Sequence, residues 1–154
     1  MFASGTSLFT ALGSEINGRV GLEWFEIQPG NGTLLQSGTL ADPTLDILYP
    51  TIAADANGNV AIAFTQSSGS EFPSVAVSTR SGNDPPGTLG SPFVLVSGSS
   101  SYSCSQNPVG WGTYSTTIVD PSQSLVLWTY QEFGHSSAPG QWSTHWTSFS
   151  VKPQ

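Results

Sequence analysis

Acidic side chains are the residues of this chain with the clearest capacity for chemistry, because pairs of carboxylates hydrolyse glycosidic bonds. Glu23 and Glu26 stand three positions apart, a spacing that points them to opposite faces of a β-strand. Asp42 and Asp46 fall in an expected loop, where solvation and turn formation account for them. Glu132 is the most interesting single acid, since it follows an aromatic run near the end of an expected strand. No catalytic residue is assigned from these positions.

Metal ligands and cofactor motifs are sparse. The segment Asp55–Asn59 superficially has the form of a calcium loop, but the EF-hand pattern places its Gly one position later and adds a Glu, so a plain hairpin turn is favoured. His135 and His145 have no ligand-like spacing and no Cys partner, which argues against zinc. Cys104 is the single cysteine, so no intrachain disulfide can form. Without a P-loop lysine, a nucleophile elbow or a dinucleotide fingerprint, we expect no metal and no cofactor.

Aromatic side chains are the remaining candidates for ligand binding. Six of them crowd the last third of the sequence: Trp111, Tyr114, Trp128, Tyr130, Trp142 and Trp146. On alternating strands about half of such residues should enter the core. Those on expected loops, chiefly Trp111 and Tyr102, could stack on sugar rings or anchor a protein partner. The predicted ligand-binding residues are therefore Trp111, Tyr114, Tyr130, Glu132 and Tyr102.

The elements that position these residues must be built from a chain that is poor in charge. Charged residues make up 8% of the 154 residues, against roughly 25% in an average domain. The 17 Gly and 11 Pro residues suit short strands joined by tight turns. An aromatic content of 11% argues against a disordered chain.

The net charge of −7 limits the partners that the chain can bind. Arg19, Arg80 and Lys152 are too few and too scattered to neutralise nucleic-acid phosphates or to hold an anionic membrane. No apolar run approaches the length of a membrane span. An acidic, Lys-poor, Ser/Thr-rich composition is common in exported bacterial proteins. We therefore expect a secreted or extracellular protein that binds neither nucleic acid nor membrane.

Alternation with a period of two dominates the sequence and predicts an all-β fold. The clearest unit, residues 49–98, contains four expected strands: Thr51–Ala54, Val60–Gln66, Phe72–Arg80 and Phe93–Val96. In the second of them, Val60, Ile62 and Phe64 would share one face, with Ala61 and Ala63 on the other. Four antiparallel strands in about 50 residues match one β-propeller blade.

An internal repeat extends this interpretation to the rest of the chain. Tyr49–Asp55 aligns with Tyr114–Asp120, and each segment leads through a turn into an apolar strand in which an aromatic residue precedes Thr. The second copy ends with an expected strand at Trp142–Phe149. Before the full unit, Arg19–Ile27 and Thr33–Leu40 predict two more strands.

The predicted architecture is a single domain, 1–154, that forms a partial propeller of about 2.5–3 four-stranded blades. It comprises a partial blade at 7–42, a full blade at 49–98 and a partial blade at 113–151. Ser7–Ala11 would add a short strand at the front, and Ser7–Leu12 could supply the strand missing after Phe149. Open sheet edges at both ends would invite pairing with another copy.

Four segments carry a resemblance to a known family: Trp111-Gly112-Thr113-Tyr114-Ser115, Val119-Asp120-Pro121, Leu127–Phe133 and Trp142-Ser143-Thr144. With them, the chain from Gly18 onward resembles the last blades of bacterial sialidase-like β-propellers, the BNR-related group. Family members typically show Arg-Trp-Gly-Asp-Tyr, then Asp-Pro, an aromatic strand ending in Glu-Tyr, and Trp-x-Thr. Here Gly110, Thr113 and Phe133 replace the Arg, the Asp and the final Tyr, and the family's Asp box is not intact.

The resemblance implies a propeller fold and raises the possibility of sialidase chemistry. That chemistry holds the substrate carboxylate with three Arg residues, beside a Tyr nucleophile and acidic partners. Because this chain contains two Arg residues, it cannot form the complete site alone.

The sequence therefore favours a non-enzymatic extracellular β-propeller module that self-assembles through open sheet edges and binds a glycan or protein partner. The alternative is a sialidase-like glycoside hydrolase subunit or fragment whose site another chain completes.

Overall fold

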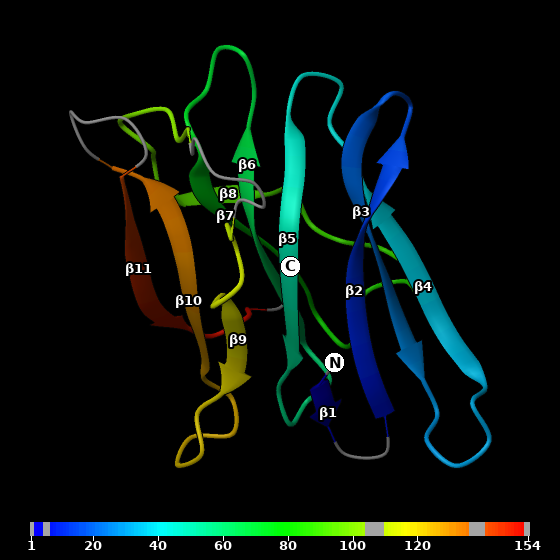
Figure 1. Cartoon of the computed structure of the whole chain (residues 1–154). Helices are drawn as coiled ribbons and strands as arrows, with labels where there is room; N and C mark the ends of the chain where they lie inside the picture. The colour runs from blue at the N-terminus through cyan, green and yellow to red at the C-terminus, as the bar shows by residue number, and fades with distance from the viewer. Residues whose placement is uncertain (1, 5–6, 104–109, 136–140, 153–154) are drawn as a thin grey trace.

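The computed structural model describes residues 2–4, 7–103, 110–135 and 141–152, a set that leaves out Cys104. These residues form eleven strands in three antiparallel sheets (Figure 1). The first sheet contains β1 (Phe2–Ser4), β2 (Ser7–Ile16), β3 (Arg19–Ile27) and β4 (Leu34–Leu40). The second contains β5 (Asp46–Ala54), β6 (Val60–Ser67), β7 (Ser74–Arg80) and β8 (Phe93–Val96). The third contains β9 (Thr116–Val119), β10 (Leu127–Gly134) and β11 (Trp142–Phe149).

The strands confirm the predicted all-β fold. In each sheet, strands that follow one another in the chain also pair with one another. No described residue belongs to a helix capable of crossing a membrane.

The first sheet differs from its prediction. The strand expected at Ser7–Ala11 continues to Ile16 and forms β2, which pairs with β3 along its whole length and with β1 at Ser7–Phe9. This segment therefore lies inside the first sheet and does not complete the third sheet after Phe149. The sheet has four strands because β1 pairs with β2, and the positive φ of Asn17 and Gly18 closes a hairpin from β2 into β3.

The central strands of the second sheet, β6 and β7, are buried on both of their faces, whereas Phe93 and Val94 of β8 are exposed. Val60, Ile62 and Phe64 of β6 pack in one core with side chains of the first sheet, including Leu22 and Trp24. The opposite face of the second sheet packs in another core on the third sheet, through Ala53, Ala61, Ala63, Val77 and Leu127. The predicted division of β6 into a large-residue face and an alanine face is confirmed.

A β-bulge in β5 lets the strand serve both cores. Leu48 pairs with Thr65 and Thr51 with Ala63, so β5 has one residue more than β6 across this interval. The extra residue shifts the alternation, and as a result Ile47 and Ile52 face the same core although their spacing is odd. Tyr49 absorbs the irregularity with a φ of 52°, which is unusual for a bulky residue.

Hydroxyl and amide groups connect the second and third sheets beside the alanine core. The Thr51 hydroxyl lies 2.7 Å from that of Thr117, which lies 3.1 Å from that of Thr129. Gln131 Nε2 donates to Thr51 Oγ1 and Thr129 Oγ1. These bonds set the alignment of β5, β9 and β10, because each buried donor requires an acceptor at a fixed place.

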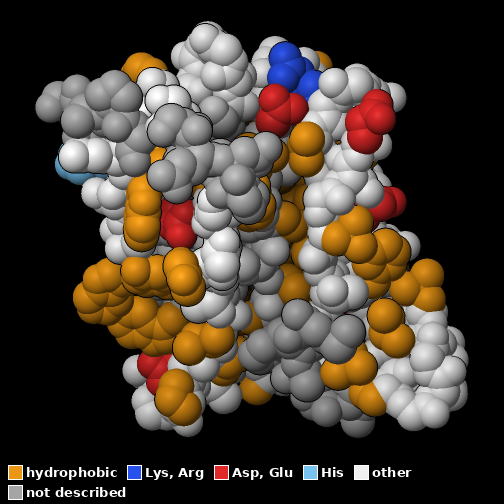
Figure 2. All heavy atoms as spheres, viewed as in Figure 1, with side chains coloured by type: hydrophobic (Ala, Val, Ile, Leu, Met, Phe, Trp, Pro, Cys, Tyr) orange, Lys and Arg blue, Asp and Glu red, His pale blue; other side chains and the backbone are white. Residues whose placement is uncertain are grey.

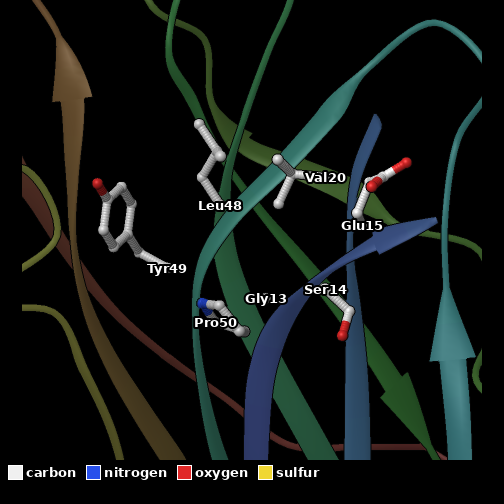
Figure 3. Close-up of a pocket in the computed structure, with 7 residues that line it drawn as sticks. All are labelled: Gly13, Ser14, Glu15, Val20, Leu48, Tyr49 and Pro50. Atoms are coloured by element: carbon white, nitrogen blue, oxygen red, sulfur yellow. The ribbon is translucent and has the colours of Figure 1, made fainter. Parts of the chain in front are cut away.

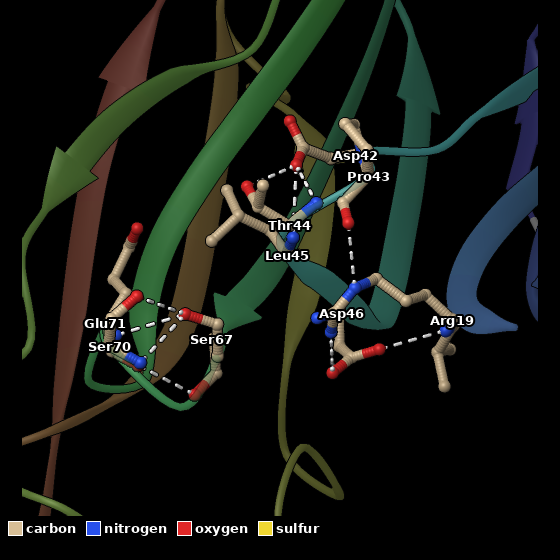
Figure 4. A network of polar contacts seen from close by, with 11 residues as sticks. Arg19, Asp42, Pro43, Thr44, Leu45, Asp46, Ser67, Ser70 and Glu71 are labelled. Atoms are coloured by element: carbon tan, nitrogen blue, oxygen red, sulfur yellow. Dashed lines mark hydrogen bonds and ion pairs between the residues drawn. The ribbon is translucent and has the colours of Figure 1, made fainter.

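Polar contacts also tie the first sheet to the start of the second (Figure 4). Arg19 Nη1 forms an ion pair with Asp46 Oδ2 at 3.1 Å, and Arg19 Nε donates to the Pro43 carbonyl. In the intervening turn the Asp42 carboxylate accepts from the backbone of Thr44 and Leu45. The Asp42 carboxylate therefore fixes the turn that follows β4, and the Arg19 side chain fixes the first residue of β5, Asp46.

The loop between β7 and β8 packs on β4 through two glycines. A Cβ at Gly38 would overlap the carbonyl oxygen of Gly87, and it would approach the Trp24 indole nitrogen within 2.6 Å. Arg80 is buried beside them, with its guanidinium carbon 5.7 Å from the centre of the Trp24 ring. The first and second sheets can therefore approach closely here only if position 38 has no side chain.

We expect Gly38→Ala to destabilise the protein by about 1–3 kcal/mol, because the added methyl forces backbone apart. The matched control is Gly69→Ala, where an added Cβ meets nothing within 4 Å, and a change of no more than about 0.5 kcal/mol is expected. Urea unfolding followed by tryptophan fluorescence measures both. Equal stability of the two variants would contradict the close approach.

Candidate functional site

Three of the five predicted ligand-binding residues lie together at the junction of the second and third sheets. Trp111 is 7% exposed, and its indole N–H donates to Thr65 Oγ1 at 3.1 Å. The ring of Tyr102 packs against Trp111 with centroids 4.8 Å apart. Most of the Trp111 surface is thus used inside the molecule, where it joins its loop to β6.

Glu132, the third of these residues, organises the same loop. Its carboxylate is 3% exposed and accepts a hydrogen bond from the Gly112 amide at 2.9 Å. Gly112 has a positive φ of 76° and lies against the ring of Tyr49, where a Cβ would overlap the ring. Glu132 therefore orders the turn that brings Trp111 inward.

Tyr114 and Tyr130 lie elsewhere. Tyr114 is 73% exposed at the end of the Trp111 loop. Tyr130 is half-buried on β10, directly opposite Trp146 of β11. The structure therefore divides the predicted set between an interior cluster and the surface.

The outer face of the third sheet carries a larger aromatic group. The register places Trp128 opposite Ile118, and Tyr130 opposite Trp146, on the side away from the second sheet. Trp128 and Trp146 stack with centroids 5.4 Å apart and an interplanar angle of 21°. We call this surface the aromatic face; its members are Ile118, Trp128, Tyr130, Trp142 and Trp146. Trp146 is 66% exposed, which is unusual for so large an apolar side chain.

Asp120 holds one side of the aromatic face in place. Its carboxylate accepts from the Trp128 indole N–H at 2.8 Å and from the hydroxyl and amide of Ser122. These donors, the indole first, lower the pKa of Asp120 from 3.8 to about 2. An ionised Asp120 therefore fixes the edge of the Trp128 ring.

The outer face of the first sheet carries apolar side chains beside polar ones such as Glu23 and Thr39. The register places Leu8 opposite Ile27, Ile27 opposite Leu34, and Leu12 beside Phe25 on the side away from the second sheet. We call this surface the aliphatic face; its members are Leu8, Leu12, Phe25, Ile27 and Leu34. In Figure 2 hydrophobic side chains gather over the third sheet at the lower left and over the first sheet at the right.

The described residues give little support for a metal centre. Among them, no three His, Cys, Asp or Glu side chains gather closely enough to hold an ion. The Asp55 carboxylate instead accepts from the amides of Asn57 and Asn59 and from Asn59 Nδ2. These bonds fit the hairpin turn predicted for this segment.

Comparison with known proteins adds no relative: no family model, curated protein or solved structure matches this chain.

Sequence reasoning did not separate the aromatic face from the core. Trp128, Trp142 and Trp146 belonged to the crowded aromatic group, but none was included among the predicted ligand-binding residues. Their even numbers, shared with Tyr130, were the available signal, because residues of one parity share a face of each strand.

We expect Asp120→Asn to destabilise the protein at neutral pH. A carboxyl group whose pKa is lowered on folding stabilises the fold above its ordinary pKa and loses that contribution as the pH falls through its folded value. The stability difference between wild type and Asp120→Asn should therefore shrink as the pH falls from about 4 to about 2.

Urea unfolding across this pH range tests the prediction. Trp128→Phe keeps the carboxylate but removes its main donor, so the pH dependence due to Asp120 should become smaller and move toward pH 4. A difference between wild type and Asp120→Asn that stays constant with pH would contradict the assigned role of Asp120.

Proposed function

We propose that this chain is a non-enzymatic, extracellular partial β-propeller whose function is to assemble with further copies. The observation that carries this proposal is the uneven burial of the three sheets. The central strands of the second sheet, β6 and β7, are covered on both faces, whereas the first and third sheets each keep apolar side chains on an outer face that no described residue covers. The aromatic face of one copy would pack on the aliphatic face of another.

The arrangement of the strands supports the propeller interpretation. Each sheet is a meander that begins at one edge, as a propeller blade does. The three first strands, β1, β5 and β9, come together, since β5 contacts both of the others. The sheets pack face to face, as neighbouring propeller blades do. The resemblance of residues 111–144 to sialidase-like blades also supports a propeller.

The composition of the two outer faces supports association between unlike surfaces. One is rich in Trp and Tyr, the residue types enriched at the centres of protein interfaces, and the other carries Leu and Ile side chains with a single Phe. Contacts between unlike faces join copies head to tail, and the copies form a closed ring when the rotation from one copy to the next completes a full turn. Two copies of three sheets would make a six-bladed ring, which lies within the usual range of about four to eight blades.

The alternative, a glycoside hydrolase subunit, has less support. Arg19 is engaged by Asp46 and the Pro43 carbonyl, and Arg80 is buried against Trp24. Glu132 is committed to the Gly112 amide. The arginines and the acid that a sialidase-like site would require from this chain are thus occupied by structural contacts. We also propose that the surface around the exposed side chain of Tyr114 binds a glycan or protein ligand.

We expect wild-type protein at micromolar concentration to have at least twice the 16.1 kDa mass of one chain in light scattering. Trp146→Thr on the aromatic face and Leu12→Thr on the aliphatic face should each shift the mass toward the monomer, because each removes exposed apolar area. Phe72→Thr is the matched control, since Phe72 is exposed outside both faces.

A wild-type protein that stays monomeric at these concentrations would contradict the proposal. So would an equal loss of mass in the Phe72→Thr control. A screen with chromogenic glycosides, sialosides included, tests the alternative. Hydrolysis that is abolished by Glu132→Gln or Tyr114→Phe would favour a glycoside hydrolase.

A further inference from the structure

The edge of β2 is open along most of its length. β1 pairs with Ser7–Phe9, and over residues 11–16 no described strand pairs with that side of β2, although β5 packs close to β2. Alternate residues along such an edge present backbone groups that can bond to an added strand. This segment contains no Pro, no Lys and no bulge, and its one charged residue is Glu15.

The neighbouring edge of β5 is protected. β5 is also the first strand of its sheet, but its bulge at Tyr49 interrupts the regular register, and Pro50 has no amide hydrogen. The contrast makes β2 the edge that can accept a strand.

A cleft of about 460 Å³ lies between these two edges (Figure 3). Gly13, Glu15 and Val20 line it from the first sheet, and Leu48 and Pro50 line it from the second. In Figure 3 the Tyr49 ring points away from Glu15 and Val20, and Leu48 lies between that ring and Val20. Farther along the same edge of β2, β1 pairs with Ser7–Phe9 and packs on β5.

We propose that this cleft binds an extended basic peptide, which adds to β2 as a strand antiparallel to it and in line with β1. The inference does not depend on self-association, because the cleft lies between the first and second sheets and not on either outer face.

The register predicts the side chains of the peptide. In an antiparallel pair, residues directly opposite one another share a face. The peptide residues opposite Glu15, Gly13 and Ala11 would therefore point toward the second sheet, in that order from the N-terminus. A Lys or Arg suits Glu15, which forms no ion pair with any described residue. An apolar residue suits the space over Gly13, against Val20, Leu48 and Pro50.

The expected pattern is thus basic-x-apolar-x-apolar. The net charge of −7 favours a basic peptide over an acidic one.

The test uses two fluorescent peptides, Lys-Thr-Val-Thr-Val-Thr and its counterpart beginning with Glu, with binding measured by anisotropy. We expect the Lys peptide to bind more tightly and to slow hydrogen exchange of the amides in residues 11–16. Glu15→Gln should weaken the Lys peptide by about 2–5-fold, as for an exposed ion pair. Gly13→Val should abolish binding, because it fills the cleft.

A Cβ at Gly13 comes no closer than 3.6 Å to its neighbours, so the fold should tolerate Gly13→Val. Gly69→Val is the matched control and should bind normally. Three results would overturn the proposal: unchanged exchange at 11–16 with saturating Lys peptide, equal binding of the Glu peptide, or unchanged binding by a folded Gly13→Val variant. Exchange at 11–16 that slows with protein concentration alone would mean that a second copy occupies the edge, and would overturn it as well.

Discussion

The need for the second sheet to pack against a sheet on either side shapes the rest of the structure. β6 places large side chains toward the first sheet and alanines toward the third sheet. The bulge at Tyr49 in β5 and the glycine contact between Gly38 and Gly87 follow from the same requirement, because both let the backbone adapt to a sheet on either side. The first and third sheets have one such neighbour each among the described residues, and their outer faces are where the fold leaves apolar surface.

A low charge content shapes how the polar groups are used. Within the described part of the chain the single ion pair is Arg19–Asp46, so carboxylates mostly bind backbone amides and hydroxyls. Asp42, Asp55 and Asp120 each accept from amides two or more residues ahead and close a turn. Glu132 does the same over a longer range for the Gly112 amide. These four acidic residues, which could be considered for catalysis from the sequence alone, thus stabilise turns and loops through hydrogen bonds to backbone amides.

Much of the fold could be predicted because it follows from local pattern. Alternation located β3 and β8 at their observed bounds, and Asn57-Gly58 located a hairpin. The length of β2, the parity shift at Tyr49 and the burial of Trp111 could not be predicted in this way, because each is decided by pairing or packing with another segment of the chain. Prediction of the ligand-binding residues met the same limit. The sequence shows that Trp146 alternates with its neighbours, but only the packing of the sheets shows which face of the third sheet is covered.

Selective cross-linking shows whether unlike outer faces of two copies meet. Thr39→Cys places a thiol on the outer face of the first sheet and Ser148→Cys places one on that of the third, both in a Cys104→Ser background. With a short bifunctional maleimide, we expect abundant cross-linked dimer when the two variants are mixed and little with either variant alone. Equal yields in the mixture and in the separate variants would contradict it.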